Sequence, residues 1–248
     1  MSNEPITPPA TKDPVMSSRV VIVLAKAPVA GRAKTRLVPP ATPQGAAAIA
    51  AAALLDTLDA ATAVPDATVL VALEGRVTDA ERADELAEAL ARVSVVPQRG
   101  DSLGERIAAA HADAARLAPG AHTVQIGMDS PQVDARLIGD ALDLVSGPAD
   151  AALGLALDGG WWALALADPA HARVISDVPT SRDDTGPATL AALRAGHPGL
   201  HPGRVLELPP LSDVDTADDA AAVSDLVPHG RFARAVRDLL PVPGGLPR

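Results

Sequence analysis

The sequence contains no cysteine and no tyrosine, and its aromatic residues are Trp161, Trp162 and Phe232. The absence of thiols excludes disulfides and thiolate metal sites, so any metal ligands are carboxylates or histidines. Because aromatic side chains are so few, alanine, leucine and valine must fill the core. With 248 residues, of which 48% are hydrophobic, the chain can still bury a sizeable core.

Positive charge is scarce as well. The chain has 21 Lys and Arg against 31 Asp and Glu, a formal net charge of −10, and it lacks the broad basic surface of a nucleic-acid-binding protein. No apolar run approaches the roughly 20 residues of a membrane span, and residues 1–18 are proline-rich without the apolar segment of a signal peptide. We expect a cytoplasmic protein without a membrane span or a nucleic-acid partner, with a disordered leader over 1–18 and a flexible tail over 241–248. The sequence leaves the oligomeric state open.

Short apolar runs alternate with helical segments along most of the chain. The first run, Val20 to Ala25, is rich in β-branched residues and predicts a strand buried on both faces. The alternation predicts an α/β fold with a mixed, mostly parallel sheet flanked by helices. Because there is no internal repeat or linker, we expect one domain over 19–240. The further strands are expected over 68–73, 93–96, 123–126, 151–157, 161–166 and 204–208.

Several local signals predict where elements begin and turn. Thr42 followed by Pro43 is typical of a helix start, and the segments 78–81 and 102–105 resemble capping boxes. Asp158-Gly159-Gly160 separates two predicted strands. This short connection suits a hairpin, although it could equally form a loop over a ligand.

Four cations follow the first predicted strand in close succession: Lys26, Arg32, Lys34 and Arg36, with Gly31 among them. Open α/β sheets bind their ligands at the carboxyl ends of strands. Lysine and arginine are strong donors to phosphate, and glycine lets a backbone approach closely. A basic turn is usually exposed to solvent and has no binding role. In a chain with a net negative charge, however, the overall composition does not account for such a cluster. We therefore interpret this segment, called the basic loop below, as a polyphosphate-binding loop.

Acidic residues follow two predicted strands in the same way. Asp129 comes directly after the strand at 123–126, and Asp213 and Asp215 follow the strand at 204–208. If these strands lie near each other, the carboxylates meet at the edge that carries the basic loop. Mg²⁺ and Mn²⁺ prefer oxygen ligands, often one or two carboxylates with substrate phosphates. We predict that Asp129 and Asp215 hold one such cation, and we interpret Asp213 as a turn residue.

Six motifs occur in an order that resembles a known family over roughly Arg19 to Leu226. They are KAPVAGRAKTRL, QRGDSLGERI, IGMDSP, LDGGWWALAL, DDTGPATLAAL and LPPLSDVDT. The chain resembles a bacterial family of glycosyltransferase-like proteins in the nucleotide-diphospho-sugar transferase superfamily, some of whose members are associated with arsenosugar biosynthesis. The resemblance implies a single-domain, Rossmann-like GT-A fold.

The resemblance also implies roles for particular residues. The basic loop would bind the nucleotide phosphates, and Asp129 would be the metal-binding and catalytic aspartate at the end of a central strand. Gln98 and Asp101 would lie near the nucleotide.

The Asp-Gly-Gly segment would border the sugar or the acceptor. Asp158 is then a candidate catalytic residue, and Gly159, Gly160 and Trp161 are candidates for the acceptor pocket. The family pattern commonly has a tyrosine where Trp161 stands, a difference that bears on the acceptor more than on the nucleotide.

Three functions are compatible with this sequence. The first is metal-dependent transfer of a glycosyl group from a nucleotide sugar to a small-molecule acceptor, with Mg²⁺ or Mn²⁺ as cofactor. The second is nucleotidyl transfer from a nucleoside triphosphate to a phosphorylated small molecule, which releases pyrophosphate. The third is a non-catalytic nucleotide-binding module, against which the retention of both Asp129 and Asp215 counts.

Overall fold

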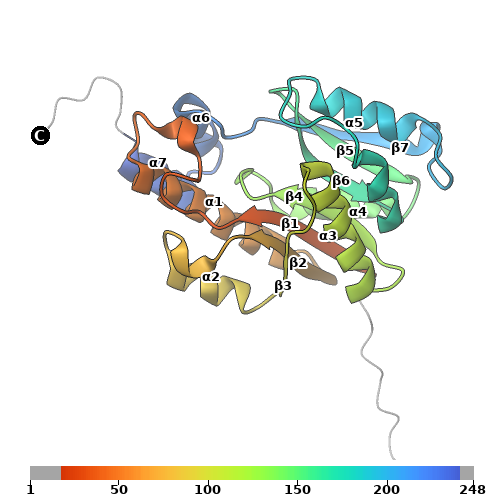
Figure 1. The fold of residues 1–248 in the computed structure, drawn as a ribbon, viewed down its shortest axis with the longest axis horizontal. Helices are drawn as coiled ribbons and strands as arrows, with labels where there is room; N and C mark the ends of the chain where they lie inside the picture. The colour runs from red at the N-terminus through yellow and green to blue at the C-terminus, as the bar shows by residue number, and fades with distance from the viewer. Residues whose placement is uncertain (1–17, 241–248) are drawn as a thin grey trace, which may run out of the picture.

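The computed structural model describes residues 18–240, so the expected tail and, apart from Ser18, the expected leader lie outside the described residues. The described residues form one seven-stranded sheet with helices on both faces (Figure 1), which confirms the α/β fold with a mixed, mostly parallel sheet. The strands are β1 Arg19–Lys26, β2 Ala67–Glu74, β3 Ser94–Pro97, β4 His122–Gly127, β5 Ala151–Ala156, β6 Trp161–Leu166 and β7 Val205–Leu211.

The strand order explains why distant parts of the chain meet. The order is β3-β2-β1-β4-β6-β5-β7, and among the described strands β6 alone runs antiparallel to its neighbours. Since β6 reverses the direction and β5 reverses it again, β5 and β7 run parallel to β1. The carboxyl ends of β1, β2, β4, β5 and β7 therefore lie at one edge of the sheet, together with the β5–β6 turn. We call this the C-terminal edge.

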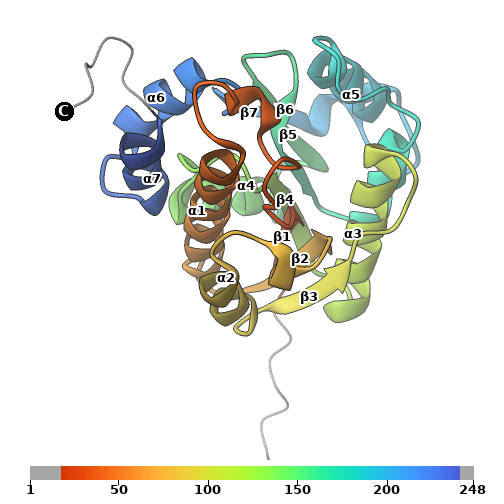
Figure 2. The ribbon, with the colours of Figure 1, turned by 60° about the vertical axis from the view of Figure 1, so that its left-hand side comes forward.

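Helices cover both faces of the sheet (Figure 2). On one face, α1, α2 and α4 pack through a core that includes Leu54, Leu86 and Ile138, while α3, η3 and α5 cover the other face. Helices α6 and α7 form a further layer against α1, around the buried Phe232. The α-helices are α1 Pro43–Thr62, α2 Ala83–Leu90, α3 Leu103–Leu117, α4 Ala135–Val145, α5 Thr185–Arg194, α6 Ala217–Leu226 and α7 Arg231–Leu239, and the 3-10 helices are η1 Thr35–Leu37, η2 Val77–Asp79, η3 Pro169–Ile175 and η4 Pro202–Arg204.

Helix α1 begins as predicted, because the Thr42 side chain accepts a hydrogen bond from Gly45 N at 3.0 Å and Pro43 occupies the first turn. By length and composition alone, this alanine-rich helix is long and apolar enough to cross a membrane. It includes Asp56 and Asp59, so it is not an uninterrupted apolar run, and the absence of a membrane span stays a prediction. Of the apolar window, 72% is buried inside the protein, between the sheet and the α6–α7 layer. Its apolar character is therefore that of a core helix.

One capping prediction is confirmed and another is wrong. At the start of α3, the side chains and backbones of Ser102 and Glu105 form a reciprocal capping box. The segment 78–81 forms no such box, and α2 begins only at Ala83. Thr78, the expected N-cap, lies inside η2, and the N–H of Glu81 donates to Pro28 O at 2.9 Å, so it is not available to the Thr78 side chain.

Candidate functional site

A cavity of about 590 Å³ opens at the C-terminal edge of the sheet, where the basic loop faces the segments that follow β4 and β7. Six predicted site residues line it: Lys26, Arg32, Lys34, Arg36, Asp129 and Asp215. The remaining lining residues are Ala33, Thr35, Ala50, Met128 and Ser181. The structure thus brings the cations of the basic loop together with the two aspartates predicted to hold a metal. The sequence analysis assigned no role to Met128, although it lies in the IGMDSP motif, and no sequence signal had indicated Ser181.

Lys34 lies between the two predicted metal ligands. Its Nζ is 2.8 Å from Asp129 Oδ2 and 3.5 Å from Asp215 Oδ1, and it also donates to the carbonyl oxygen of Val214. Only 12% of the Lys34 side chain is exposed, so this residue is not a solvated cation on a surface turn. Its backbone is left-handed, with φ of 46°, directly before η1.

The surrounding carboxylates keep Lys34 charged. Burial alone would lower the pKa of Lys34, but the negative charges of Asp129, Asp213 and Asp215 outweigh burial and raise the pKa above its ordinary value. Arg36 adds a second cation from the same loop, with Nη1 2.6 Å from Asp215 Oδ2. Both carboxylate oxygens of Asp215 are therefore already paired with the basic loop.

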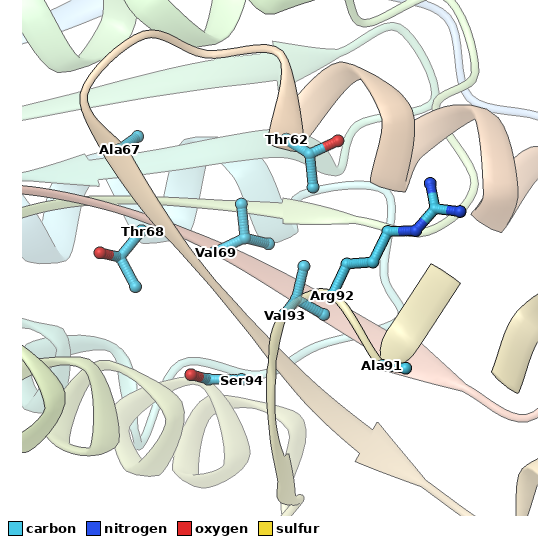
Figure 3. A pocket seen from close by; sticks show the side chains of 8 residues that line it. All are labelled: Thr62, Ala67, Thr68, Val69, Ala91, Arg92, Val93 and Ser94. Atoms are coloured by element: carbon cyan, nitrogen blue, oxygen red, sulfur yellow. The ribbon is translucent and has the colours of Figure 1, made fainter. Parts of the chain in front are cut away.

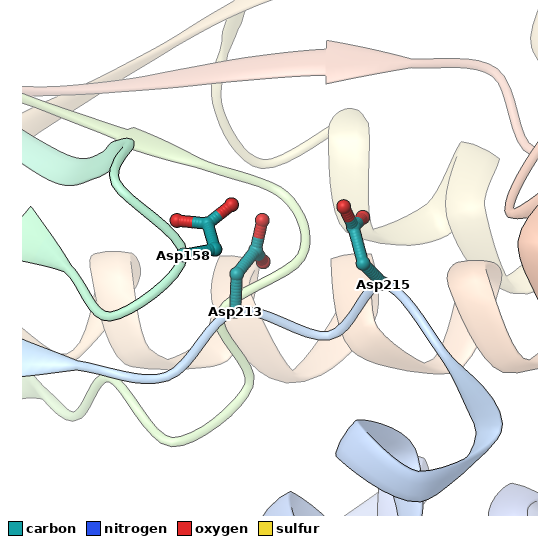
Figure 4. A group of neighbouring side chains, drawn as sticks. All are labelled: Asp158, Asp213 and Asp215. Atoms are coloured by element: carbon teal, nitrogen blue, oxygen red, sulfur yellow. The ribbon is translucent and has the colours of Figure 1, made fainter. Parts of the chain in front are cut away.

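A group of three carboxylates stands beside these ion pairs (Figure 4). Oxygen atoms of Asp158, Asp213 and Asp215 all lie within 4.8 Å of one another. Asp158 comes from the β5–β6 turn, and the other two come from the loop after β7. Asp213 does accept a hydrogen bond from Val214 N at 2.7 Å, but its carboxylate also belongs to this group. The alternation in Asp213-Val214-Asp215 was the available signal, because residues i and i+2 of an extended segment point to the same side.

This acidic group carries more negative charge than its cations neutralise. Burial, reinforced by the negative charge of Asp129, raises the pKa of Asp213 to about 7, although Lys34 opposes this effect. All the candidate ligand atoms are carboxylate oxygens, the donor set that hard divalent cations prefer. The residues present therefore fit Mg²⁺ or Mn²⁺.

The Asp158-Gly159-Gly160 segment lies in the turn of the β5–β6 hairpin, the first of the two alternatives that the sequence left open. Gly159 has φ of +91°, and a Cβ at this position would lie 1.8 Å from the carbonyl oxygen of Asp183. Gly186 N donates to Gly159 O at 2.8 Å, so the turn is held against the start of α5. Only glycine fits here, because the backbone is left-handed and the two segments are in direct contact.

The two tryptophans of β6 point to opposite faces of the sheet, as expected for successive strand residues. Trp162 is buried, and its Nε1 donates to Pro209 O at 3.0 Å. It packs on Gly154, where an added Cβ would lie 2.3 Å from that indole nitrogen. Trp161 is half-buried and packs partly against the core of the opposite face. It does not line the 590 Å³ cavity, so its contact with an acceptor stays a prediction.

Other predicted residues lie near the C-terminal edge without lining the cavity. Gln98 Nε2 donates to Ala25 O at 2.8 Å and to Ala72 O at 3.0 Å, which ties together the ends of β1 and β2. Asp101 is exposed just before α3, and Gly31 is exposed in the basic loop. Their roles in nucleotide binding therefore stay predictions. The same holds for the acceptor roles of Asp158, Gly159 and Gly160, which lie outside the cavity lining.

A second cavity, of about 440 Å³, lies at the opposite end of the sheet, where β2 and β3 begin (Figure 3). Arg92 is its one charged lining residue, and the Arg92 guanidinium is paired with Glu88 of α2. The other lining residues are Thr62, Ala67, Thr68, Val69, Ala91, Val93 and Ser94. This cavity contains none of the predicted site residues, and the candidate site is the C-terminal edge.

A family model described as "Uncharacterized protein conserved in bacteria (DUF2064)" matches residues 57–182, about half of the chain. The chain belongs to this family. In this DUF2064 protein, the matched region runs from the last turn and a half of α1 to the segment before α5, so it includes Asp129 and Asp158. The basic loop and the Asp213–Asp215 segment lie outside it. No curated protein matches the chain.

Solved structures resemble this DUF2064 protein over most of its length. A protein from Desulfovibrio desulfuricans G20, assigned as a nucleotide-diphospho-sugar transferase, superposes with a TM-score of 0.77 at 24% identity, covering 90% of this chain and 95% of its own. A cytidylyltransferase from Leptospira borgpetersenii gives a TM-score of 0.51 at 14% identity, covering 89% and 93%. A Mycobacterium sp. strain JC1 homologue of Mycobacterium tuberculosis rv0371c also gives 0.51, at 19% identity, covering 86% and 99%. At these identities the similarity establishes the fold, and it confirms the GT-A type expected from the sequence motifs.

Proposed function

We propose that this protein is a nucleotide-using transferase. The observation that carries the proposal is the cavity at the C-terminal edge, in which Arg32, Lys34 and Arg36 face Asp129 and Asp215. Cations that bind phosphates and carboxylates that bind a metal are the two parts that a nucleotide diphosphate requires. Their position at the carboxyl ends of parallel strands is where open α/β sheets bind ligands.

A divalent cation would be held by the carboxylates of this edge. Asp129 and Asp215 remain the ligands predicted from the sequence, and Asp213 and Asp158 lie close enough to Asp215 to complete or replace them. Mg²⁺ or Mn²⁺ bound there would offset negative charge on the departing phosphates. The raised pKa of Asp213 supports this assignment, because a site with an excess of carboxylates gains most from an added cation.

The chain's own residues then have separable roles. Lys34 and Arg36 would stabilise the charge that develops on the leaving phosphate oxygen, since both cations line the cavity that would receive the phosphates. Asp158 would accept the proton of the acceptor's nucleophile. Its Oδ1 is used by Gly160 N at 2.9 Å, whereas Oδ2 is free among the described residues to face an acceptor. The rigid hairpin turn around Gly159 would hold this carboxylate in place.

Glycosyl transfer from a nucleotide sugar is the form of the reaction that we favour. It is supported by the assignment of the D. desulfuricans protein as a nucleotide-diphospho-sugar transferase, whose fold matches along nearly the full length of both chains. Nucleotidyl transfer is the second candidate, because the cytidylyltransferase from L. borgpetersenii has the same fold. Both reactions need positively charged side chains that bind the nucleotide phosphates opposite a bound metal ion, so this requirement does not distinguish them.

The test is a thermal-shift screen of nucleotide sugars and nucleoside triphosphates, each with and without Mn²⁺, followed by product analysis with the stabilising ligand. A released nucleoside diphosphate identifies glycosyl transfer, and released pyrophosphate identifies nucleotidyl transfer. Binding without turnover would indicate a nucleotide-binding module, and no stabilisation by any nucleotide would contradict the proposal.

The affinity for the ligand found in this screen should depend on Arg36. Because a charge-assisted hydrogen bond contributes roughly 1.5–3 kcal/mol, Arg36→Ala should weaken nucleotide binding about tenfold or more. Arg136→Ala is the matched control, since Arg36 and Arg136 are 74% and 81% exposed and Arg136 lies on α4, away from the cavity. Equal affinities of the two variants, measured by calorimetry, would show that the basic loop does not bind the nucleotide.

A further inference from the structure

The ammonium group of Lys34 is placed where a bound cation would sit. It lies 2.8 Å from Asp129 Oδ2 and 3.5 Å from Asp215 Oδ1, and it also donates to the carbonyl oxygen of Val214. Three oxygen atoms from two separate loops thus converge on one nitrogen. Carboxylate and carbonyl oxygens are also the atoms that ligate Mg²⁺ and Mn²⁺ in proteins.

A metal ion and this ammonium group cannot share the same oxygens. Both carry positive charge, and the Lys34 side chain is only 12% exposed, so solvent screens their repulsion poorly. Arg36 holds the second oxygen of Asp215 at 2.6 Å, which leaves that carboxylate no unpaired oxygen. A cation can reach Asp129 and Asp215 together only after Lys34 has moved away.

The backbone conformation of Lys34 is consistent with a residue whose side-chain contacts hold it in place. With φ of 46°, Lys34 occupies the left-handed region that residues other than glycine seldom adopt. Such a conformation persists where the surrounding contacts determine it, and it is often found in segments that switch. Release of the ammonium group removes the ion pairs that secure this turn.

We propose that Lys34 is a built-in cation that closes the acidic site until the phosphates of a nucleotide draw it away. The phosphates take the ammonium group, and the divalent metal takes Asp129 and Asp215. Metal and nucleotide binding are thereby coupled, and the free protein binds metal weakly. This inference rests on the proposed function, since it assumes that the cavity receives phosphates and a metal.

The first experiment uses Mn²⁺ alone, titrated by calorimetry or electron paramagnetic resonance into the wild-type protein and into Lys34→Met. We expect the dissociation constant of Mn²⁺ to fall at least tenfold in Lys34→Met, because the oxygens are then vacant. Arg32→Met is the matched control: Arg32 lines the same cavity and, among the described residues, makes no ion pair. It should change the constant less than threefold. Equal constants for wild type and Lys34→Met, or equal gains in the two variants, would overturn the proposal.

The second experiment uses the native protein and therefore does not depend on the folding of a variant. The sequence has three lysines, Lys12, Lys26 and Lys34, so acetylation of each can be followed by mass spectrometry. Lys34 should be protected in the free protein, and saturating Mn²⁺ without nucleotide should increase its acetylation rate several-fold. Lys26, whose side chain is 45% exposed, is the internal control and should react at an unchanged rate. If Mn²⁺ binds while Lys34 stays protected, the two cations do not compete and the proposal fails.

Neither experiment contains a nucleotide, so their outcomes are independent of the ligand screen. If the protein binds no nucleotide but Lys34→Met binds Mn²⁺ more tightly than the wild type, Lys34 and the metal compete as proposed, and the proposed function is wrong. A protein that binds nucleotide, but whose Lys34→Met variant binds Mn²⁺ no more tightly than the wild type, loses this inference and keeps the nucleotide site.

Discussion

Replacement of Asp213 by asparagine should stabilise the metal-free protein at alkaline pH but not in acid. The pKa of Asp213 is raised from 3.8 to about 7 by burial and by the charge of Asp129. Between these two values the folded state binds more protons than the unfolded state, so the contribution of Asp213 to stability falls as the pH rises from about 4 to about 7. Below that window the contribution is fully present, and above it the folded protein carries an unfavourable charge.

The size of the effect follows from the shift. A change of about three pKa units corresponds to roughly 4 kcal/mol as an upper limit at about pH 8. Asp213 is partly exposed, so solvent screens part of this repulsion, and we expect Asp213→Asn to raise the free energy of unfolding by about 1–3 kcal/mol there. The asparagine Oδ1 can still accept the hydrogen bond from Val214 N, which limits other effects of the change.

The assay is urea unfolding of wild type and Asp213→Asn in EDTA, at about pH 4 and about pH 8. The exposed Asp225 of α6 provides the control, because Asp225→Asn removes a carboxylate that lies away from this edge of the sheet. Addition of Mn²⁺ at about pH 8 should stabilise the wild type more than Asp213→Asn. An equal gain at both pH values, or a loss at about pH 8, would refute the excess of negative charge that we infer at this edge.

Two further predictions concern stability. Burial lowers the pKa of His111 to about 3, so the free energy of unfolding of the wild type should fall as the pH drops from about 6.5 to about 3. In unfolding experiments His111→Leu should reduce this loss of stability in acid. An unchanged loss would contradict a neutral buried imidazole. Gly159→Ala should lose about 1–3 kcal/mol in denaturant unfolding, since its Cβ would lie 1.8 Å from a backbone oxygen at a positive φ, whereas the nearest atom to a Cβ at Gly160 is a movable side-chain oxygen at 3.2 Å. Equal losses in Gly159→Ala and Gly160→Ala would refute the close contact with α5.

The strands and most helices could be predicted because their signals are local. The run Val20 to Ala25 lacks polar residues on either face, so it indicates a strand covered by helices on both sides, and β1 is such a strand. Thr42 and Ser102 cap helices with their own side chains. The box at 78–81 failed because Thr78 lies inside η2 and the N–H of Glu81 donates to Pro28 O, a contact between distant segments that the spacing of the motif does not reveal.

The sequence predicted which residues form the site, but not which of them form ion pairs with one another. The sequence identifies Asp129, Asp215 and Lys34 as chemically suited residues at the ends of strands. It does not show that the Lys34 ammonium group lies between the two carboxylates, because this depends on the left-handed backbone of Lys34. Nor does it distinguish a turn-forming Asp213 from one that is also buried beside other carboxylates, because burial is a property of the assembled edge.

The two outermost strands have a consequence for the behaviour of the protein at high concentration. An unpaired strand exposes backbone donors and acceptors on which another chain can add a strand, the first step of edge-to-edge aggregation. At one border β3 is short and ends at Pro97, and at the other β7 contains Pro209 and Pro210. Prolines have no N–H group to donate, so both borders are poor templates for a further strand. Each end of the sheet therefore disfavours the addition of a strand from a second copy of the chain.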